Sequence, residues 1–527
     1  MITGKNYVGS TLKAAGEKTF KTFNPQLDKE NPWVFTEATP EEIEEAVTLA
    51  NQAFGAYKNC SGLEKAVFLN AIADEVLALG DNLLVQYCSE SGFPMGRAEG
   101  ERGRMVGQLR AFAQMLAEGS WVQATIDTAL PDRLPAPKED LRKMLVPLGP
   151  VVVFGSSNFP FAFSTAGGDT ASALAAGCPV IVKSHSMHVG TGEMVASAII
   201  KAAQKTNMPE GVFSNLVGGG TTLGASLVKH PLVKAVGFTG SIRAGRALFD
   251  LASQRPEPIP VFAEMGSINP VVFLPEALKT NSQKWATAYA GSITLGAGQF
   301  CTNPGLLIGI KGAELNQFSI ELSEAIEKIT PFCMLHPSMK DSFEEGTATM
   351  MAQNGVSKIA EYKGEAAPNY GLQKVLTVDG KTFLENKTLS HEVFGPVSIL
   401  VQCNDEHQLL KIIKQLDGQL TGTIIGEPKE LEDYKELIEG LQNRVGRLIF
   451  NGVPTGVEVC PSMIHGGPYP ASSDSRFTAV GIHAVYRWVR PFSYQNWPNE
   501  LLPVELQDEN PLQILRTLNN IQTKSKV

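Results

Sequence analysis

The chain has 527 residues, more than one hydrophobic core usually organises, so we expect two or three domains. Its 43% hydrophobic and 19% charged residues are typical of globular proteins and exclude disordered and collagen-like classes. A formal charge of −9 argues against a general affinity for nucleic acid or for anionic membranes. We therefore expect a small-molecule partner, without nucleic acid or membrane.

The N-terminus, MITGKNYVGSTLK, lacks the apolar core of a signal peptide, and no stretch approaches about 18 uninterrupted apolar residues. A cytoplasmic location is the resulting expectation. The seven cysteines stand far apart and are odd in number, which fits reduced thiols. No CxxC or HExxH motif occurs, and His185 and His188 lack a third ligand, so no metal site is expected.

The first predicted helix begins after Thr39, where Pro40 and Glu42 complete a helix-start pattern. Apolar residues then recur at helical spacing as far as Phe54. On this pattern the first ~130 residues are predicted to be mainly helical.

From Val146 onward, short and continuously apolar runs alternate with helical stretches. Strands that are apolar throughout, with helices between them, predict a parallel sheet covered on both faces, as in doubly wound dinucleotide-binding domains. The predicted strands lie at 150–155, 179–184, 213–219, 235–241 and 260–266, and the clearest helices at 164–177 and about 190–205.

A second alternation of predicted strands and helices runs from Asn269 to about Asn451 and indicates a second sheet domain. Its predicted strands lie at 306–310, 395–403, 422–426 and 446–452. The segment 130–146 contains three prolines and reads as an extended arm. The β-prone segment 484–496 could pair with this arm or with a neighbouring subunit.

Polar or reactive residues follow several of these strands. Because ligands of open α/β sheets bind at the carboxyl ends of the strands, these positions are the first candidates for a site. They are Asn158, Lys183, Gly240 with Ser241, and Glu264, with Cys301 following Glu264 after 37 residues. Cys301 lies in GAGQFCTNPG, a segment with little side-chain bulk.

Six motifs occur in a fixed order: SNFPF, VIVK, FTGSIRAG, AEMGSINP, GQFC and HEVFGPV. In this order they resemble the aldehyde dehydrogenase superfamily over most of the chain. GERGRMVGQLR (100–110) and RFTAVGIHAVYRWVRPFSYQN (476–496) are similar to its 2,5-dioxovalerate (alpha-ketoglutaric semialdehyde) dehydrogenases. The resemblance implies a doubly wound Rossmann-like cofactor domain, a second α/β catalytic domain and a small β oligomerisation arm.

The resemblance also implies the catalytic residues. Cys301 would attack the aldehyde and carry a thiohemiacetal and then a thioester, Glu264 would activate the hydrolytic water, and Asn158 would stabilise the oxyanion together with the Cys301 N–H. The alternatives are a buried cysteine that only packs, a capping glutamate, and an asparagine that caps the next helix. The glycines beside Cys301 are expected to let cofactor and substrate approach the thiol.

For the cofactor, the resemblance implies contacts from eight residues: Lys183, Ser186, Gly220, Gly240, Ser241, Gly245, Glu392 and Phe394. Relatives that prefer NAD commonly hold a glutamate where this chain has Ser186. Without that carboxylate a 2′-phosphate is not repelled, so NADP should be accepted, with NAD also used. Phe394 could equally be a core aromatic.

A semialdehyde that carries a carboxylate needs a cation at the far end of the substrate tunnel. The segment around residues 97–110 supplies Arg97, Arg102, Arg104 and Arg110, of which Arg104 or Arg110 is the expected anchor. A solvated, charged helix face is the alternative for each arginine. Phe163 is expected to line the tunnel.

The resulting prediction is an NADP-accepting dehydrogenase that converts 2,5-dioxovalerate to 2-oxoglutarate. Alternatives are the same reaction on a medium-chain or long-chain aldehyde, a CoA-acylating dehydrogenase, and a scaffold without activity. A homodimer or homotetramer is expected by analogy. The expected domains are 1–130 with 147–264 for the dinucleotide, 265–480 for catalysis, 131–146 with 481–500 as the arm, and 501–527 as a tail.

Overall fold

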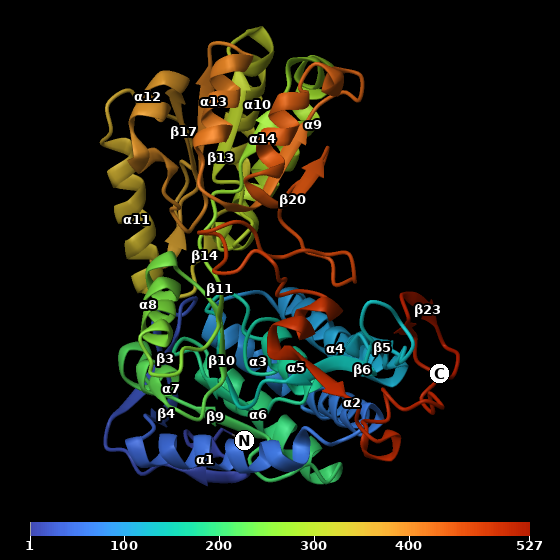
Figure 1. Cartoon of the computed structure of the whole chain (residues 1–527). Coiled ribbons are helices and arrows are strands. Elements are labelled where there is room, and N and C mark those ends of the chain that lie inside the picture. The colour runs from blue at the N-terminus through green and yellow to red at the C-terminus, as the bar shows by residue number, and fades with distance from the viewer. Residues whose placement is uncertain (1) are drawn as a thin grey trace.

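A computed structural model describes residues 2–527. Two α/β units, each built on its own seven-stranded sheet, occupy opposite ends of the molecule in Figure 1, and a third, five-stranded sheet lies beside the lower unit. This arrangement confirms the predicted α/β fold with a separate β arm. Within the described residues no helix is both long and apolar enough to cross a membrane.

The first sheet has the strand order β11-β10-β7-β8-β9-β1-β2. Its first five strands are parallel, whereas β1 and β2 join antiparallel at one edge. The strands are β7 (Val151–Phe154), β8 (Val180–Lys183), β9 (Phe213–Leu216), β10 (Ala235–Thr239), β11 (Val261–Glu264), β1 (Asn6–Val8) and β2 (Thr11–Lys13). All five predicted strands are present.

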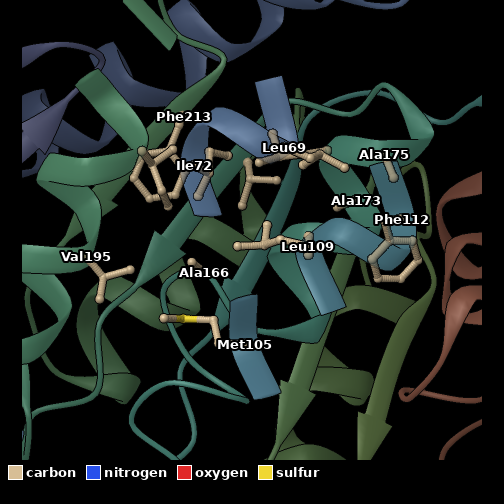
Figure 2. Close-up of a cluster of buried hydrophobic side chains, with 14 of the residues drawn as sticks. Leu69, Ile72, Met105, Leu109, Phe112, Ala166, Ala173, Ala175, Val195 and Phe213 are labelled. Carbon is tan, nitrogen blue, oxygen red and sulfur yellow. The ribbon is translucent and has the colours of Figure 1, made fainter. Parts of the chain in front are cut away.

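Alternate side chains of these strands enter two different cores. Val151 and Val153 pack in the larger core with α2, α4, α5 and α6, whereas Val152 packs on the opposite face with α1, α7 and α8. Figure 2 shows the larger core, where Leu69 and Leu109 from two helices meet. Because both faces are covered, every residue of β7 is buried, which explains its uninterrupted apolar run.

Within residues 2–264, eight α-helices precede the end of β11. They are α1 (Pro40–Tyr57), α2 (Gly62–Ala78), α3 (Gly80–Ser91), α4 (Met95–Glu118), α5 (Gly168–Ala176), α6 (Val189–Lys205), α7 (Ala225–Lys229) and α8 (Ile242–Ser253). The predicted capping box of Thr39 and Glu42 begins α1, and Gly177 ends α5 in the left-handed conformation.

The prediction that the first ~130 residues are mainly helical is wrong for the N-terminal part. That part contains β1, β2, β3 (Thr19–Asn24) and β4 (Lys29–Thr36), of which β3 and β4 form a separate hairpin. These strands are short or carry mixed polar and apolar residues, so their sequence has no long apolar run that would indicate a strand.

The second sheet has the order β15-β17-β18-β13-β12-β19-β20. Its strands are β12 (Val271–Phe273), β13 (Leu306–Ile310), β15 (Ser357–Glu361), β17 (Lys374–Asp379), β18 (Val397–Cys403), β19 (Gln419–Ile425) and β20 (Val445–Phe450). One face packs on α9 (Pro275–Thr294) and α10 (Ala313–Lys328). The other packs on α11 (Pro337–Met351), α12 (Gly380–Glu385), α13 (Glu406–Gln415) and α14 (Lys435–Gln442). A small separate ladder joins β14 (Phe332–Cys333) to β16 (Tyr370–Gly371).

The arm sheet has the order β21-β6-β5-β22-β23. The predicted late strand β21 (Val489–Gln495) pairs with β6 (Leu141–Pro147) over seven residue pairs, which is one of the two predicted partners. The polar tail also has a defined place, because β22 (Arg516–Leu518) pairs with β5 (Thr125–Asp127) and forms a hairpin with β23 (Ile521–Thr523). The tail therefore extends the arm sheet.

Candidate active site

The candidate site lies where the two α/β units meet. Glu264 is the last residue of β11, Asn158 follows β7 by four residues, and Cys301 lies between α9 and β13 of the second unit. The irregular chain between β20 and β21 crosses this junction in Figure 1. It runs beside β11, with Ser472 bridged to Glu264 and the Ser473 N–H donating to the Ala263 carbonyl.

Asn269 holds the Cys301 loop in place. Its side-chain Nδ2 donates to the carbonyl oxygens of Cys301 at 2.8 Å and of Asn303 at 2.9 Å, and its Oδ1 accepts from the Thr421 hydroxyl. These buried bonds tie the loop to β19. Sequence reasoning did not single out Asn269, although its place within AEMGSINP, the motif that contains Glu264, could have drawn attention to it.

The glycines beside Cys301 are required by contacts within the protein. Gly298 has a φ of +64°, and a Cβ there would lie 2.3 Å from the Gly395 carbonyl group. Gly296, with a φ of +54°, would place a Cβ 2.6 Å from Nη1 of Arg97. The expectation that these glycines let cofactor and substrate approach the thiol stays a prediction, and the contacts add a packing reason for them. They set the path of the loop that presents the thiol.

A histidine that the sequence reasoning missed joins the thiol to the carboxylate. His465 Nε2 lies 3.3 Å from Cys301 Sγ, and its Nδ1 lies 2.6 Å from Oε2 of Glu264 in an ion-pair contact. Both partners of that ion pair are buried. Apart from this contact, neither Glu264 oxygen has a hydrogen-bond partner in the part of the chain that the structure describes. A carboxylate oxygen thus remains able to accept a proton from water.

The charges around His465 favour its protonated form. Burial by itself would lower the pKa of His465, but the opposite charges of Glu264 and of a Cys301 thiolate outweigh it and raise the pKa to about 10. The imidazole ring also packs against Phe163, with 5.8 Å between the ring centroids. The His465 ring is therefore held in place by Phe163 as well as by Glu264.

Asn158 lies beside the cysteine loop and does not cap a helix. Its side-chain Nδ2 donates to the Gln299 carbonyl at 3.0 Å, while the next helix, α5, begins only after Gly167. An amide group has two N–H donors, so this bond leaves one for a ligand. The Asn158 carbonyl accepts from Arg97 Nη2 at 2.8 Å, which fixes the residue from the other side.

An open cavity of about 360 Å³ lies in front of this loop. Aromatic rings and two arginines of α4 line it, among them Phe93, Phe159, Phe300, Arg97 and Arg104. The Phe159 ring stands 5.5 Å from the Phe163 ring and 5.5 Å from the Phe300 ring, in edge contacts with both. The cavity is therefore apolar except for the two arginines and Glu101, whose carboxylate already accepts from Tyr87 and from two backbone N–H groups.

Arg104 has an unusual environment for an arginine. Its guanidinium lies 5.5 Å from the centroid of the Phe163 ring, and its buried Nε and Nη2 have no hydrogen-bond partner among residues 2–527. Burial lowers the pKa of Arg104, and the nearby charges of Glu101 and Cys301 oppose this. Unpaired guanidinium donors in an apolar cavity indicate a binding place for an anion such as a carboxylate.

The other arginines of α4 have different surroundings. Arg110 is exposed and pairs with Asp74 at 3.2 Å, so it does not line the cavity, and we carry only Arg104 forward as the anchor. Arg102 donates to the Gly80 carbonyl. Arg97 stacks 3.7 Å from the centroid of the Phe93 ring and keeps one buried donor, Nη1, unpaired within the described chain. Arg447 of β20, which sequence reasoning did not consider, also lies within the electrostatic reach of Cys301.

The candidate cofactor residues gather at the carboxyl ends of the first sheet. Burial lowers the pKa of Lys183, the last residue of β8, to about 8, opposed by the charge of Glu37. Ser241 caps α8, whose first N–H groups can hold a phosphate. The Gly240 N–H donates to the Glu264 carbonyl, so it fixes the end of β11. Ser186 is exposed.

The remaining candidates divide between packing and a second pocket. A Cβ at Gly245 would lie 2.7 Å from Met265, so Gly245 allows α8 to approach β11, whereas Gly220 faces open space. Glu392 and Phe394 line a pocket together with Gly298 of the cysteine loop. Burial raises the pKa of Glu392 to about 7, opposed by a backbone hydrogen bond from Ser267.

The residues present fit a nicotinamide dinucleotide. A buried lysine with a lowered pKa and a capped helix N-terminus suit its hydroxyl and phosphate groups, and Glu392 lies in a pocket that reaches the cysteine loop. A thiol, a carboxylate with free lone pairs and an amide donor meet beside that pocket. Fold and site together are those of a dinucleotide-dependent enzyme with a thiol placed to act as a nucleophile.

Comparison with known proteins agrees with this class. The model of the aldehyde dehydrogenase family matches residues 12–468. Alpha-ketoglutaric semialdehyde dehydrogenase 2 of Azospirillum brasilense is 47% identical over 518 residues, covering 98% of each chain. The alpha-ketoglutaric semialdehyde dehydrogenase of Acinetobacter baylyi is 44% identical over 99% of each chain.

Solved structures support the fold. A 1-pyrroline-5-carboxylate dehydrogenase from Thermus with bound NAD aligns with a TM-score of 0.79 and 21% identity, covering 93% of this chain and 92% of that one. Betaine aldehyde dehydrogenase from Staphylococcus aureus in complex with NAD⁺ aligns with a TM-score of 0.80 and 17% identity, over 94% and 95%. The chain belongs to the aldehyde dehydrogenase family and is an oxidoreductase that acts on aldehydes.

Proposed function

We propose that this enzyme oxidises 2,5-dioxovalerate to 2-oxoglutarate with NADP as the preferred cofactor. The observation that carries the substrate assignment is Arg104, which lines an aromatic cavity beside the candidate site and has two buried, unpaired guanidinium donors within the described chain. A short substrate with an aldehyde at one end and a carboxylate at the other suits this arrangement. The names of the two relatives from Azospirillum and Acinetobacter agree with it.

The proposed reaction begins at Cys301. Its sulfur attacks the aldehyde carbon, and the oxygen of the resulting thiohemiacetal receives hydrogen bonds from the Asn158 side chain and from the Cys301 N–H. A bound nicotinamide dinucleotide supplies the hydride acceptor, which turns the adduct into a thioester. Glu264 then takes a proton from a water molecule that attacks the thioester carbon. The carboxylic acid leaves and the sulfur is set free.

The proposed cofactor contacts follow from the positions above. Lys183 and Ser186 would bind the adenosine ribose and its phosphate, and the N-terminus of α8, with Gly240 and Ser241, would bind the diphosphate. Glu392 and Phe394 would bind the nicotinamide end. Gly220 and Gly245 stay predictions for this region. NADP is favoured because position 186 holds a serine, so no carboxylate there repels the 2′-phosphate.

The domain organisation, the assembly and the location of the enzyme are also part of the proposal. We assign 1–130 with 147–264 to cofactor binding, 265–480 to catalysis, 131–146 with 481–500 to an oligomerisation arm, and 501–527 to a tail. A homodimer or homotetramer is the expected assembly. The seven cysteines are all free thiols and the net charge is negative, which supports a cytoplasmic enzyme that acts on a small molecule.

Replacing Arg104 by methionine should lower kcat/KM for 2,5-dioxovalerate about 100-fold, which corresponds to about 2.7 kcal/mol. The methionine keeps most of the side-chain volume but removes the donors for the substrate carboxylate. For hexanal, which has no carboxylate, kcat/KM should change less than about threefold. Steady-state formation of NADPH at 340 nm measures both constants.

The matched control for Arg104 is Arg110→Met on the same helix. Arg110 is exposed and pairs only with Asp74, so this variant should behave as wild type with both aldehydes. An equal loss for both substrates in Arg104→Met would show a structural role and refute the anchor. A wild-type preference for hexanal of tenfold or more would favour the aliphatic-aldehyde alternative.

Replacing Ser186 by glutamate should lower the ratio of kcat/KM for NADP to that for NAD by at least tenfold, about 1.4 kcal/mol. The new carboxylate would repel a 2′-phosphate and accept hydrogen bonds from free ribose hydroxyls. Ser186→Ala is the control, because it removes the hydroxyl without adding charge. If glutamate leaves the ratio unchanged, residue 186 does not contact the ribose.

A further inference from the structure

The Cys301–His465–Glu264 chain is more than a packing contact. The two ring nitrogens of His465 face two different functional groups, Sγ of Cys301 at 3.3 Å and the Glu264 carboxylate at 2.6 Å. The ring is buried, so bulk water does not compete for either nitrogen. A buried imidazole between a thiol and a carboxylate can move a proton from the sulfur and stabilise the charge it then carries.

The backbone around His465 holds the ring in this orientation. The His465 N–H donates to the Thr478 hydroxyl at 2.9 Å, and the His465 carbonyl accepts from the Ala479 N–H at 2.9 Å. On the next residue, Gly466, a Cβ would lie 2.8 Å from the Phe477 carbonyl oxygen, so the two stretches of chain approach closely. The ring is therefore preorganised, and its position does not depend on a bound substrate.

We infer that His465 is a catalytic residue that takes the proton of the Cys301 thiol, so that the resting enzyme holds a thiolate–imidazolium pair braced by Glu264. This inference rests on the proposed function, in which Cys301 is the nucleophile. In the step, the S–H bond breaks and the proton binds Nε2, leaving the electron pair on sulfur. The thiolate released by thioester hydrolysis restores the same pair, so His465 needs no other proton source.

This arrangement assigns thiol deprotonation to His465 and activation of the hydrolytic water to Glu264, two roles that a single carboxylate would otherwise combine. Glu264 contacts Nδ1 of His465 and not Cys301 Sγ, so its own contribution to thiol activation passes through the imidazole. Apart from this contact with Nδ1, its oxygens have no hydrogen bond in the described residues, so the carboxylate can still accept a water proton. His465 therefore acts before hydride transfer, whereas Glu264 acts as a base after it.

The pH behaviour follows from the charges that face the pair. Glu264 and Cys301 attract the imidazolium, and Arg104 and Arg447 are the cations that feel the Cys301 charge. The raised pKa of His465, about 10, means that the imidazolium persists from acid pH up to that value and is lost above it. The arginines do not titrate in this range, so a change in pH profile on substituting His465 reports on the histidine.

The test is the rate of Cys301 alkylation by iodoacetamide between pH 5.5 and 9.5, followed by mass spectrometry on the intact enzyme without aldehyde. In the wild type the rate should change less than about threefold between pH 6 and 9. In His465→Gln it should follow an ordinary thiol, with a pKa near 8.5, and fall about 200-fold between pH 9 and pH 6. Cys60, a partly buried thiol whose pKa is raised by burial, provides the internal reference in the same sample.

Two results would overturn the inference. A wild-type profile that follows that of Cys60 would show that the pair does not exist, even if His465→Gln does not fold. Identical flat profiles in wild type and variant would show that other groups ionise the thiol. Because no aldehyde is present, either result leaves the proposed function intact, whereas full dehydrogenase activity of an enzyme lacking Cys301 would defeat the proposed function.

Discussion

Replacement of Cys301 by serine should lower kcat/KM for every aldehyde by at least about 10⁴-fold, or about 5.4 kcal/mol. The hydroxyl of serine is a far weaker acid than a thiol, so a histidine poised beside it cannot keep it ionised. The ester formed on serine would also hydrolyse more slowly than a thioester, because an alkoxide is a poorer leaving group than a thiolate. NADPH formation at 340 nm with 2,5-dioxovalerate and with hexanal measures the effect.

The control for this substitution is Cys60→Ser, which changes a thiol next to the end of α1, outside the candidate site. It should leave kcat/KM unchanged. Binding of NADP to Cys301→Ser, followed by the quenching of protein fluorescence, should remain within about twofold of wild type, because the cofactor residues are untouched. More than 1% residual activity in Cys301→Ser would contradict covalent catalysis at this residue.

The parallel sheets could be predicted from the sequence because burial leaves a simple pattern. A strand such as β7 is covered by helices on both faces, so all four of its residues are apolar, and the other four parallel strands of the sheet are likewise buried at nearly every position. Strands β1 to β4 were not predicted because β1 and β2 have only three residues each, whereas β3 and β4 carry mixed polar and apolar residues and are largely exposed.

The spacing of the arginines along α4 distinguishes those that line the cavity from Arg110, which does not. An α-helix turns by about 100° per residue, so positions seven apart lie on nearly the same face, whereas positions six apart do not. Arg97 and Arg104 are seven apart and both line the cavity, whereas Arg110 is six beyond Arg104 and faces Asp74. The helical spacing alone would have favoured Arg104 over Arg110.

His465 could not be found from local sequence. It lies in an irregular segment between β20 and β21, where no period predicts which side chain points inward. Its partner Cys301 is 164 residues away in the chain. Only the path of this segment beside β11, fixed by backbone bonds to Ala263 and Met265, brings the imidazole between thiol and carboxylate. Such a contact is a property of the tertiary fold.

Replacing Glu264 by glutamine should lower the steady-state kcat about 10³-fold while leaving a burst of about one NADPH per active site. Glutamine keeps the shape of the side chain but cannot take the water proton, so the thioester should form once and then accumulate. The burst itself should be slower than in the wild type, because the imidazolium of His465 loses its carboxylate partner. Stopped-flow absorbance at 340 nm separates the two phases.

An added nucleophile distinguishes a blocked hydrolysis from a damaged site. Hydroxylamine attacks a thioester without needing Glu264, so it should restore turnover of Glu264→Gln and yield the hydroxamate of the substrate. It should not accelerate His465→Gln, in which formation of the adduct, and not its hydrolysis, is slow. If Glu264→Gln shows neither a burst nor a response to hydroxylamine, Glu264 acts before hydride transfer, and the division of labour between the carboxylate and the imidazole is refuted.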